Sequence, residues 1–146
     1  MNRKLVSIGC LSISLLTLVG IFGGAAFYVQ WIGQVVLDAY ASDWTSEFLI
    51  AHLRSNDNQW PTNWEDLRDE YDKLADPNHY PFTFVALQDR VVLDWKVDTL
   101  SLATADPPQI FFRLKSGRQA SYGGDPNERI REYFANRSLN EDKREP

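Results

Sequence analysis

Side chains that perform covalent or metal chemistry are few in this chain and are scattered along it. Cys10 is the only cysteine, and His52 and His79 are the only histidines. A nucleophile needs a base within hydrogen-bonding reach, and a zinc site needs ligands at short repeated spacings such as C-x-x-C or H-x-x-x-H. The sequence contains neither arrangement, so we expect no metal, no cofactor and no catalytic residue. The catalytic alternative is a hydrolase whose carboxylates meet only in the folded chain.

Two motifs could bind ions, and both have a simpler structural interpretation. Carboxylates crowd residues 65–72, but calcium sites take their ligands from a loop that turns at a glycine, which this stretch lacks. We therefore predict a solvated acidic helix face there, made of Glu65, Asp66, Asp69, Glu70 and Asp72. Gly123 and Gly124 precede a predicted helix, where backbone N–H groups can hold phosphate. No Lys-Ser or Lys-Thr pair follows them, so we interpret the glycines as a turn.

Aromatic residues supply the candidate interaction site. The stretch NDNQWPTNWEDL, residues 56–67, places Trp60 and Trp64 around a proline. Such a pair can form a binding platform, or it can act as a hydrophobic staple that fastens a helix to its neighbour. No polar or charged partners stand at fixed places beside it, which favours the staple. Trp44, Trp60 and Trp64 are the candidate interaction residues, and an apolar pocket lined by Trp44, Trp60 or Trp95 would indicate a ligand-binding module.

The position of these residues depends on a long helix that begins in the most apolar part of the chain. Residues 5–29 contain no ionisable side chain except Cys10 and Tyr28, and about 20 apolar residues suffice to cross a bilayer. Arg3 and Lys4 precede this segment. By the positive-inside tendency, residues 1–4 are cytoplasmic and the domain that follows residue 29 lies on the other side of the membrane. We expect this membrane to be the cytoplasmic membrane of a bacterium. We therefore predict a single-pass, uncleaved signal-anchor.

Three further interpretations of this segment stay open. Gly24-Ala25-Ala26 resembles a signal-peptide cleavage site, which would release a secreted binding module. Ile8-Gly9 before Cys10 resembles a lipoprotein signal, although Ser7 stands where leucine is usual. Gly20 and Gly24 form a small-xxx-small pair, the spacing that lets two membrane helices approach closely. They are the candidate residues for self-association through the membrane helix.

The charge of the remaining chain excludes one class of partner. All 20 acidic residues but only 13 of the 15 basic ones lie beyond Gln30, which leaves that part with a charge of −7. Nucleic acids need a basic surface to neutralise their phosphates. We therefore expect a membrane and a protein as partners, and no nucleic acid.

Helical periodicity continues beyond the membrane segment. Apolar residues recur at steps of 4, 3, 4 and 3 between residues 37 and 51, which predicts an amphipathic helix through Arg54 with one buried stripe. Thr62 and Glu65 have the form of a capping box, so a short second helix is expected over 63–74. We also predict a C-terminal helix over 126–137, with Asp125 as its N-cap, followed by a flexible charged tail at 138–146.

The region between these helices has the composition of strands. Residues 80–87 are aromatic and β-branched, and residues 90–98 alternate apolar with mostly polar side chains. A third alternating run follows DPP, with Ile110, Phe112 and Leu114 on one side. The expected fold is therefore α+β, with a sheet of three or four antiparallel strands covered on one face by the helices. Residues 30–137 would form this domain and its helical stem.

The order of these elements resembles that of bacterial type IV pilin-like and pseudopilin proteins. In that family a long helix that starts in the membrane is often followed by a Tyr-Pro or Trp-Pro turn and an antiparallel sheet, and here QWPTNW stands at residues 59–64. The resemblance implies filament assembly after peptidase processing. The processing motif, Gly or Ala followed by Phe and four residues later by Glu, does not occur, and the first glutamate is Glu47. The chain also resembles small anchored proteins of planctomycete-type bacteria, a family that implies no assigned activity.

Overall fold

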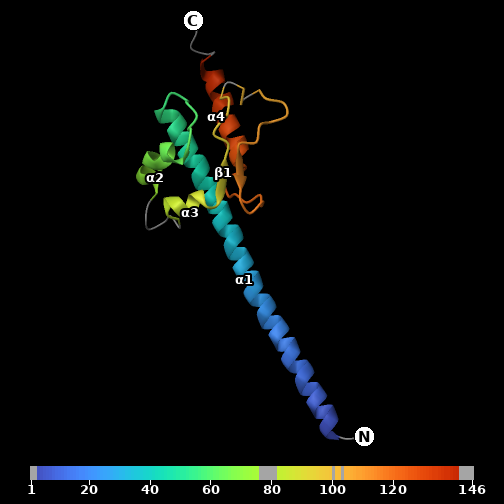
Figure 1. Ribbon diagram of the computed structural model, residues 1–146. Helices are drawn as coiled ribbons and strands as arrows, with labels where there is room; N and C mark the ends of the chain where they lie inside the picture. Colours follow the sequence, from blue (N-terminus) through green and yellow to red (C-terminus); the bar gives the residue numbers. More distant parts are fainter. Residues whose placement is uncertain (1–2, 76–81, 100, 103, 142–146) are drawn as a thin grey trace. The chain divides into compact units, whose positions relative to one another are not determined.

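The computed structural model describes residues 3–75, 82–99, 101–102 and 104–141 and has an α+β fold (Figure 1). The chain divides into two compact units, Met1–Val35 and Val36–Pro146. In chain order the elements are α1 (Arg3–Ser55), the 3-10 helix η1 (Trp64–Leu67), α2 (Arg68–Leu74), α3 (Phe84–Gln88), β1 (Val91–Leu93), β2 (Phe112–Leu114) and α4 (Pro126–Glu141). The predicted long N-terminal helix, short second helix and C-terminal helix are all present.

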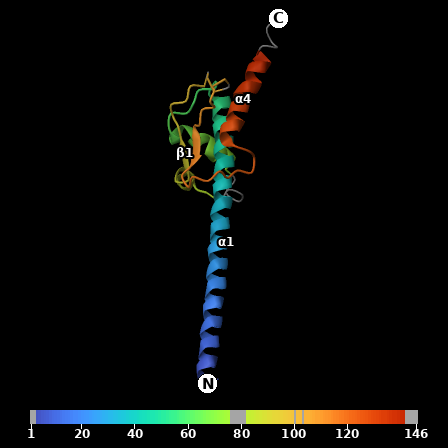
Figure 2. The same cartoon turned by 90° about the vertical axis from the view of Figure 1, so that its right-hand side faces the viewer.

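Within the second unit, α1 is buried on more than the single stripe that its periodicity predicts. Ala41 and Phe48 of that stripe are buried, but so are Leu49 and Leu53. The reason is that α4 lies along α1 in both views, in addition to the short helices and the sheet (Figures 1 and 2). Arg129 of α4 joins the two helices, because its Nη1 donates to Ser46 Oγ at 2.8 Å. The C-terminal part of α1 is thus the central helix of the unit.

The second helix begins one residue later than its predicted capping box. The N-cap is Asn63, whose Oδ1 accepts a hydrogen bond from the N–H of Glu65 at 2.8 Å. Asp66 reaches back, and its Oδ2 accepts both the N–H and the hydroxyl of Thr62 at 2.7 Å. The box between Thr62 and Glu65 was therefore wrong. A reciprocal arrangement of the same kind exists, with Asn63 and Asp66 in the two roles.

The sheet has two strands among the described residues, fewer than the three or four predicted. β1 and β2 pair antiparallel, with Val91 opposite Leu114 and Leu93 opposite Phe112. Residues 84–87, part of the stretch 80–87 that was expected as strand, lie instead in the helix α3, which Thr83 Oγ1 caps by accepting the N–H of Ala86 at 3.2 Å.

A specific side chain limits the sheet at each of the two strands. The expected strand over 90–98 stops at Leu93, where Asp94 Oδ1 accepts the N–H of Lys96 and turns the chain. The far edge of β2 is occupied by Asn127 of α4, whose Oδ1 accepts the N–H groups of Phe111 and Phe112 at 3.0 and 2.9 Å. A side chain from the C-terminal helix therefore takes the place where a further strand would pair.

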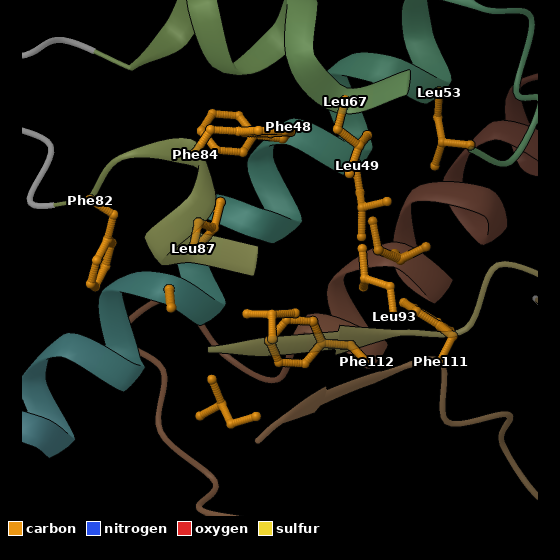
Figure 3. Close-up of a cluster of buried hydrophobic side chains, with 14 of the residues drawn as sticks. Phe48, Leu49, Leu53, Leu67, Phe82, Phe84, Leu87, Leu93, Phe111 and Phe112 are labelled. Carbon is orange, nitrogen blue, oxygen red and sulfur yellow. The ribbon is translucent and has the colours of Figure 1, made fainter. Parts of the chain in front are cut away.

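The core of the unit lies where α1, the short helices, the sheet and α4 meet. Figure 3 shows side chains from these elements converging, among them Phe48, Leu67, Leu87 and Phe112. The alternation predicted for the third strand is broken, because Phe111 is buried and Ile110 is 57% exposed. At the C-terminus, α4 continues to Glu141, four residues beyond its predicted end.

Candidate functional site

A buried carboxylate on α1 organises one side of the second unit. Asp38 is 2% exposed, although it lies off the predicted apolar stripe. Its Oδ1 accepts a hydrogen bond from Arg90 Nη1 at 2.9 Å, and its Oδ2 accepts one from Ser116 Oγ at 2.7 Å and one from Arg118 Nη1 at 2.8 Å. One acid therefore ties α1 to the start of β1 and to the loop after β2.

The protonation of Asp38 identifies it as an anchor rather than an acid catalyst. Burial raises the pKa of this carboxyl, but the hydrogen bonds from Ser116, Arg118 and Arg90 outweigh burial and bring the pKa below its ordinary value. A general acid at neutral pH needs a raised pKa. Asp38 is an ionised carboxylate held by two guanidinium groups.

A second acid of α1, Asp43, holds the loop that leads into α4. Its two carboxylate oxygens accept the N–H groups of Tyr122 and Gly123, both at 2.9 Å, and Oδ1 also accepts the hydroxyl of Ser121 at 2.7 Å. A Cβ on Gly123 would come within 3.2 Å of Asp43 Oδ1. The anion at this glycine pair is thus the chain's own carboxylate, bound to the backbone in the way that a phosphate would be.

Beside these two anchors lies a cavity of about 540 Å³, between β2, the loop after it and the N-terminus of α4. Its walls carry three arginines, Arg113, Arg118 and Arg131, with one carboxylate, Asp125. Ser42 of α1 also lines it and is 1% exposed. Ser42 Oγ and Arg131 Nε are buried and have no hydrogen-bond partner in the part of the chain that the structure describes. All the lining residues except Ser42 lie between Pro108 and Arg131, but sequence reasoning missed the site because they share no spacing typical of a binding motif.

The three candidate tryptophans pack at the border of the core and do not line this cavity. Trp60 donates its indole N–H to the carbonyl of Asp94 at 2.9 Å and lies edge-on to Phe111. Trp64 lies edge-on to Trp95, with ring centroids 5.6 Å apart, and Trp44 packs on Phe48. All three indoles are partly exposed. Their role in binding a partner stays a prediction.

The acidic face predicted for the second helix is wrong at one position. Glu70 is 5% exposed and accepts a hydrogen bond from Ser55 Oγ at 2.9 Å. Its Oε2 lies 3.9 Å from Nδ1 of His52, which is also buried. Helix packing of α2 on the end of α1 brings this pair together. Among the described residues, no group of three or more His, Cys, Asp and Glu side chains could hold a metal ion; His79 lies outside the described residues.

The first unit is the apolar part of α1. Among the described residues, one helix, Gly20–Ser55, is long and apolar enough to cross a membrane, and none of its most apolar stretch is buried. Gly20 and Gly24 lie in this part, and a Cβ added to either would meet no other atom within 4 Å. Nothing in the single chain therefore requires glycine at these two positions.

Comparison of the chain with models of protein families, with curated proteins and with solved structures finds no match.

Proposed function

We propose that this chain is a single-pass membrane protein of the bacterial cytoplasmic membrane. Residues 5–29 cross the bilayer, residues 1–4 are cytoplasmic, and residues 30–137 form a non-enzymatic domain outside the cytoplasm that binds another protein. A helix long and apolar enough to cross a membrane, and whose apolar stretch is unburied, supports this proposal.

The distribution of apolar side chains around this helix carries the proposal. Large apolar residues from position 21 to 32 are at least 39% exposed: Ile21, Phe22, Phe27, Tyr28, Val29, Trp31 and Ile32. Successive helical residues point about 100° apart, so these side chains cover about 220° of the helix circumference, much more than the stripe of a helix that packs on one core. Each Å² of apolar surface left in water costs about 25 cal/mol of free energy compared with the same surface buried. Lipid is the environment that covers every side of a helix at once.

Self-association through the membrane helix is a narrower form of this proposal. The open space beside Gly20 and Gly24 would let a second helix approach closely. A pilin-like assembly would use the same helix, and the single run of α1 from Arg3 to Ser55 has the layout that such an assembly needs. Trp44, Trp60 and Trp64 are the residues proposed to contact a partner protein.

The intact mass of the protein in carbonate-washed membranes and in the soluble fraction tests the anchor. We expect the full-length mass in the membranes. A mass that lacks residues 1–26, found in the soluble fraction, would show that the segment is a cleaved signal peptide. The orientation is tested separately with alkaline phosphatase fused to the C-terminus, which is active only outside the cytoplasm. If the chain is membrane-bound but the fusion is inactive, the proposed orientation is wrong, while the proposal of a membrane anchor is unaffected.

A further inference from the structure

We propose that the cavity between β2, the loop after β2 and the N-terminus of α4 binds a small organic oxyanion with an apolar body. The ligand's charged head would be a carboxylate or a phosphate. This inference goes beyond the membrane anchor and does not depend on it. Three features of the cavity carry it: an excess of positive charge, arginine side chains that can donate hydrogen bonds, and an apolar wall.

Positive charge gathers here in a chain that is acidic as a whole. Three arginines line the cavity against one carboxylate, while the net charge of the chain is −5. That carboxylate, on Asp125, is already committed, because its Oδ1 accepts the N–H of Asn127 at 2.9 Å and the side-chain amide of Asn127 at 3.0 Å. Arg118 shares Asp38 with Arg90, so two cations balance against one anion there. The cavity therefore attracts anions.

Two donors at the cavity have no acceptor. Ser42 Oγ and Arg131 Nε are buried and unpartnered within the described residues. The nearest carboxylate oxygen that pairs with Arg131 is Glu128 Oε1, which lies 3.8 Å from Nη2 and is beyond hydrogen-bonding distance. Buried polar groups in folded proteins are almost always hydrogen-bonded, so such exceptions need an explanation. Both atoms are enclosed by protein, so an oxyanion in the cavity would accept hydrogen bonds from the outer guanidinium nitrogens of the lining arginines and not from these two atoms directly. Arginine forks match the geometry of carboxylate and phosphate.

The rest of the wall suits an apolar body. Ile110, 57% exposed, lines the cavity together with Phe112, Leu114 and Pro126. A volume of about 540 Å³ is in the range of small-molecule sites, which run from about 300 to 1,000 Å³. Such sites are mostly apolar with a few polar groups that orient the ligand. The cavity combines both, so an inorganic ion alone would use only part of it.

Matched probes on the full-length protein in detergent test this inference. Benzoate and phenyl phosphate carry the two oxyanions on the same ring, benzyl alcohol is the neutral probe and benzylammonium the cationic one. Thermal unfolding is followed by tryptophan fluorescence at probe concentrations up to about 10 mM, where fragment-sized ligands bind detectably. We expect at least one anion to raise the unfolding midpoint in a saturable way, and the neutral and cationic probes to leave it unchanged. The stronger anion identifies the head group.

Three variants locate the binding. Arg113→Gln and Arg131→Gln should each raise the dissociation constant of the active anion about tenfold or more, because each removes a charged donor. Lys115→Gln is the control: it removes the same charge next to the sheet, but Lys115 does not line the cavity. The Lys115→Gln variant should bind the active anion with a dissociation constant within about twofold of that of the parent protein. Circular dichroism shows whether each variant is folded. If only one arginine variant folds, its dissociation constant alone is sufficient for the test.

Two results would overturn the inference. One is that neither anion stabilises the protein more than benzyl alcohol does. The other is that the arginine variants bind the anion as tightly as Lys115→Gln, which would mean that the anion binds elsewhere.

Discussion

At the scale of single residues, three polar side chains on helices α1 and α4 tie the loops and the sheet edge of the second unit to those helices. Asp38 fixes the start of β1 and the loop after β2, Asp43 fixes the turn before α4, and Asn127 takes the free edge of β2. Each accepts two or three hydrogen bonds from groups that would otherwise have to find water. The removal of Asp38 or Asn127 would leave partly buried donors without acceptors, which costs more than the bond itself contributes.

The substitution Asp38→Asn tests the first of these residues. It keeps the size of the side chain but leaves Arg90 and Arg118 without their carboxylate. We expect a loss of about 2–4 kcal/mol in the free energy of unfolding, because breaking one side of a buried ion pair is strongly destabilising. Urea unfolding of the full chain at pH 7 measures it. Asp72→Asn, an exposed acid on α2, is the control and should change the free energy by less than about 0.5 kcal/mol.

The effect of Asp38→Asn should depend on pH with a definite sign. Hydrogen bonds keep the pKa of Asp38 in the folded protein below its unfolded value of about 3.9. The stabilisation is therefore complete above the unfolded pKa and is lost as pH falls through the folded pKa. The gap in stability between parent and variant should shrink below about pH 4. A gap that stays constant down to pH 2 would contradict this role for the carboxylate.

At the scale of elements, the sequence predicts those segments whose signals are local. The apolar run of α1 and the Asp125-Pro126 start of α4 each lie within a few residues, and both helices form where expected. The sheet could not be predicted in the same way. The side chain that limits β2 is Asn127, 15 residues further along, and its effect follows only from the packing of α4. The candidate cavity was missed for a different reason: its lining lies almost wholly within residues 108–131, but those residues form no recognisable motif.

The turn before α4 gives a prediction at this scale. Gly124 has φ +96°, and a Cβ there would meet nothing within 4 Å, so any cost of Gly124→Ala comes from the backbone conformation alone. We expect a loss of about 1–2 kcal/mol in unfolding free energy. Gly33→Ala is the matched control, because Gly33 lies within α1 and is also free of neighbours. It should stabilise by up to about 1 kcal/mol. Equal effects of both substitutions would contradict the strain at Gly124.

At the scale of the whole molecule, the chain joins an apolar helix to an acidic α+β unit. The apolar helix is the part that the sequence indicates most directly, because a run of 25 residues without a charge is a strong and local signal. The interior of the second unit was predicted less well. Its described residues form two strands where three or four were expected, and Asp38 and Glu70 are buried where periodicity placed them outside. Periodicity describes one face of a helix, whereas α1 is covered on several.

The substitution Phe22→Arg tests the membrane segment in the intact chain. Phe22 is 70% exposed, so a change there disturbs no core. An arginine in the middle of a membrane helix costs about 2.5–3.5 kcal/mol of insertion free energy. We expect a clear loss of protein from carbonate-washed membranes, measured by quantitative immunoblot. Phe22→Ala, which removes the ring without adding charge, should stay in the membrane. A Phe22→Arg protein that fractionates like the parent would argue against residues 5–29 as the spanning segment.

The contacts of Asp38 also limit how early the second unit can fold during synthesis. Its partner Arg118 is 80 positions further along the chain, so at about 5–20 residues per second the ribosome delivers that arginine about 4–16 s after Asp38. During this interval Phe48, Leu49 and Leu53 of α1 have emerged, while α4, which covers part of the helix, has yet to be translated. The central helix of the unit is therefore the first element made and the last to be enclosed. Its apolar face must be shielded from other chains until synthesis is nearly complete.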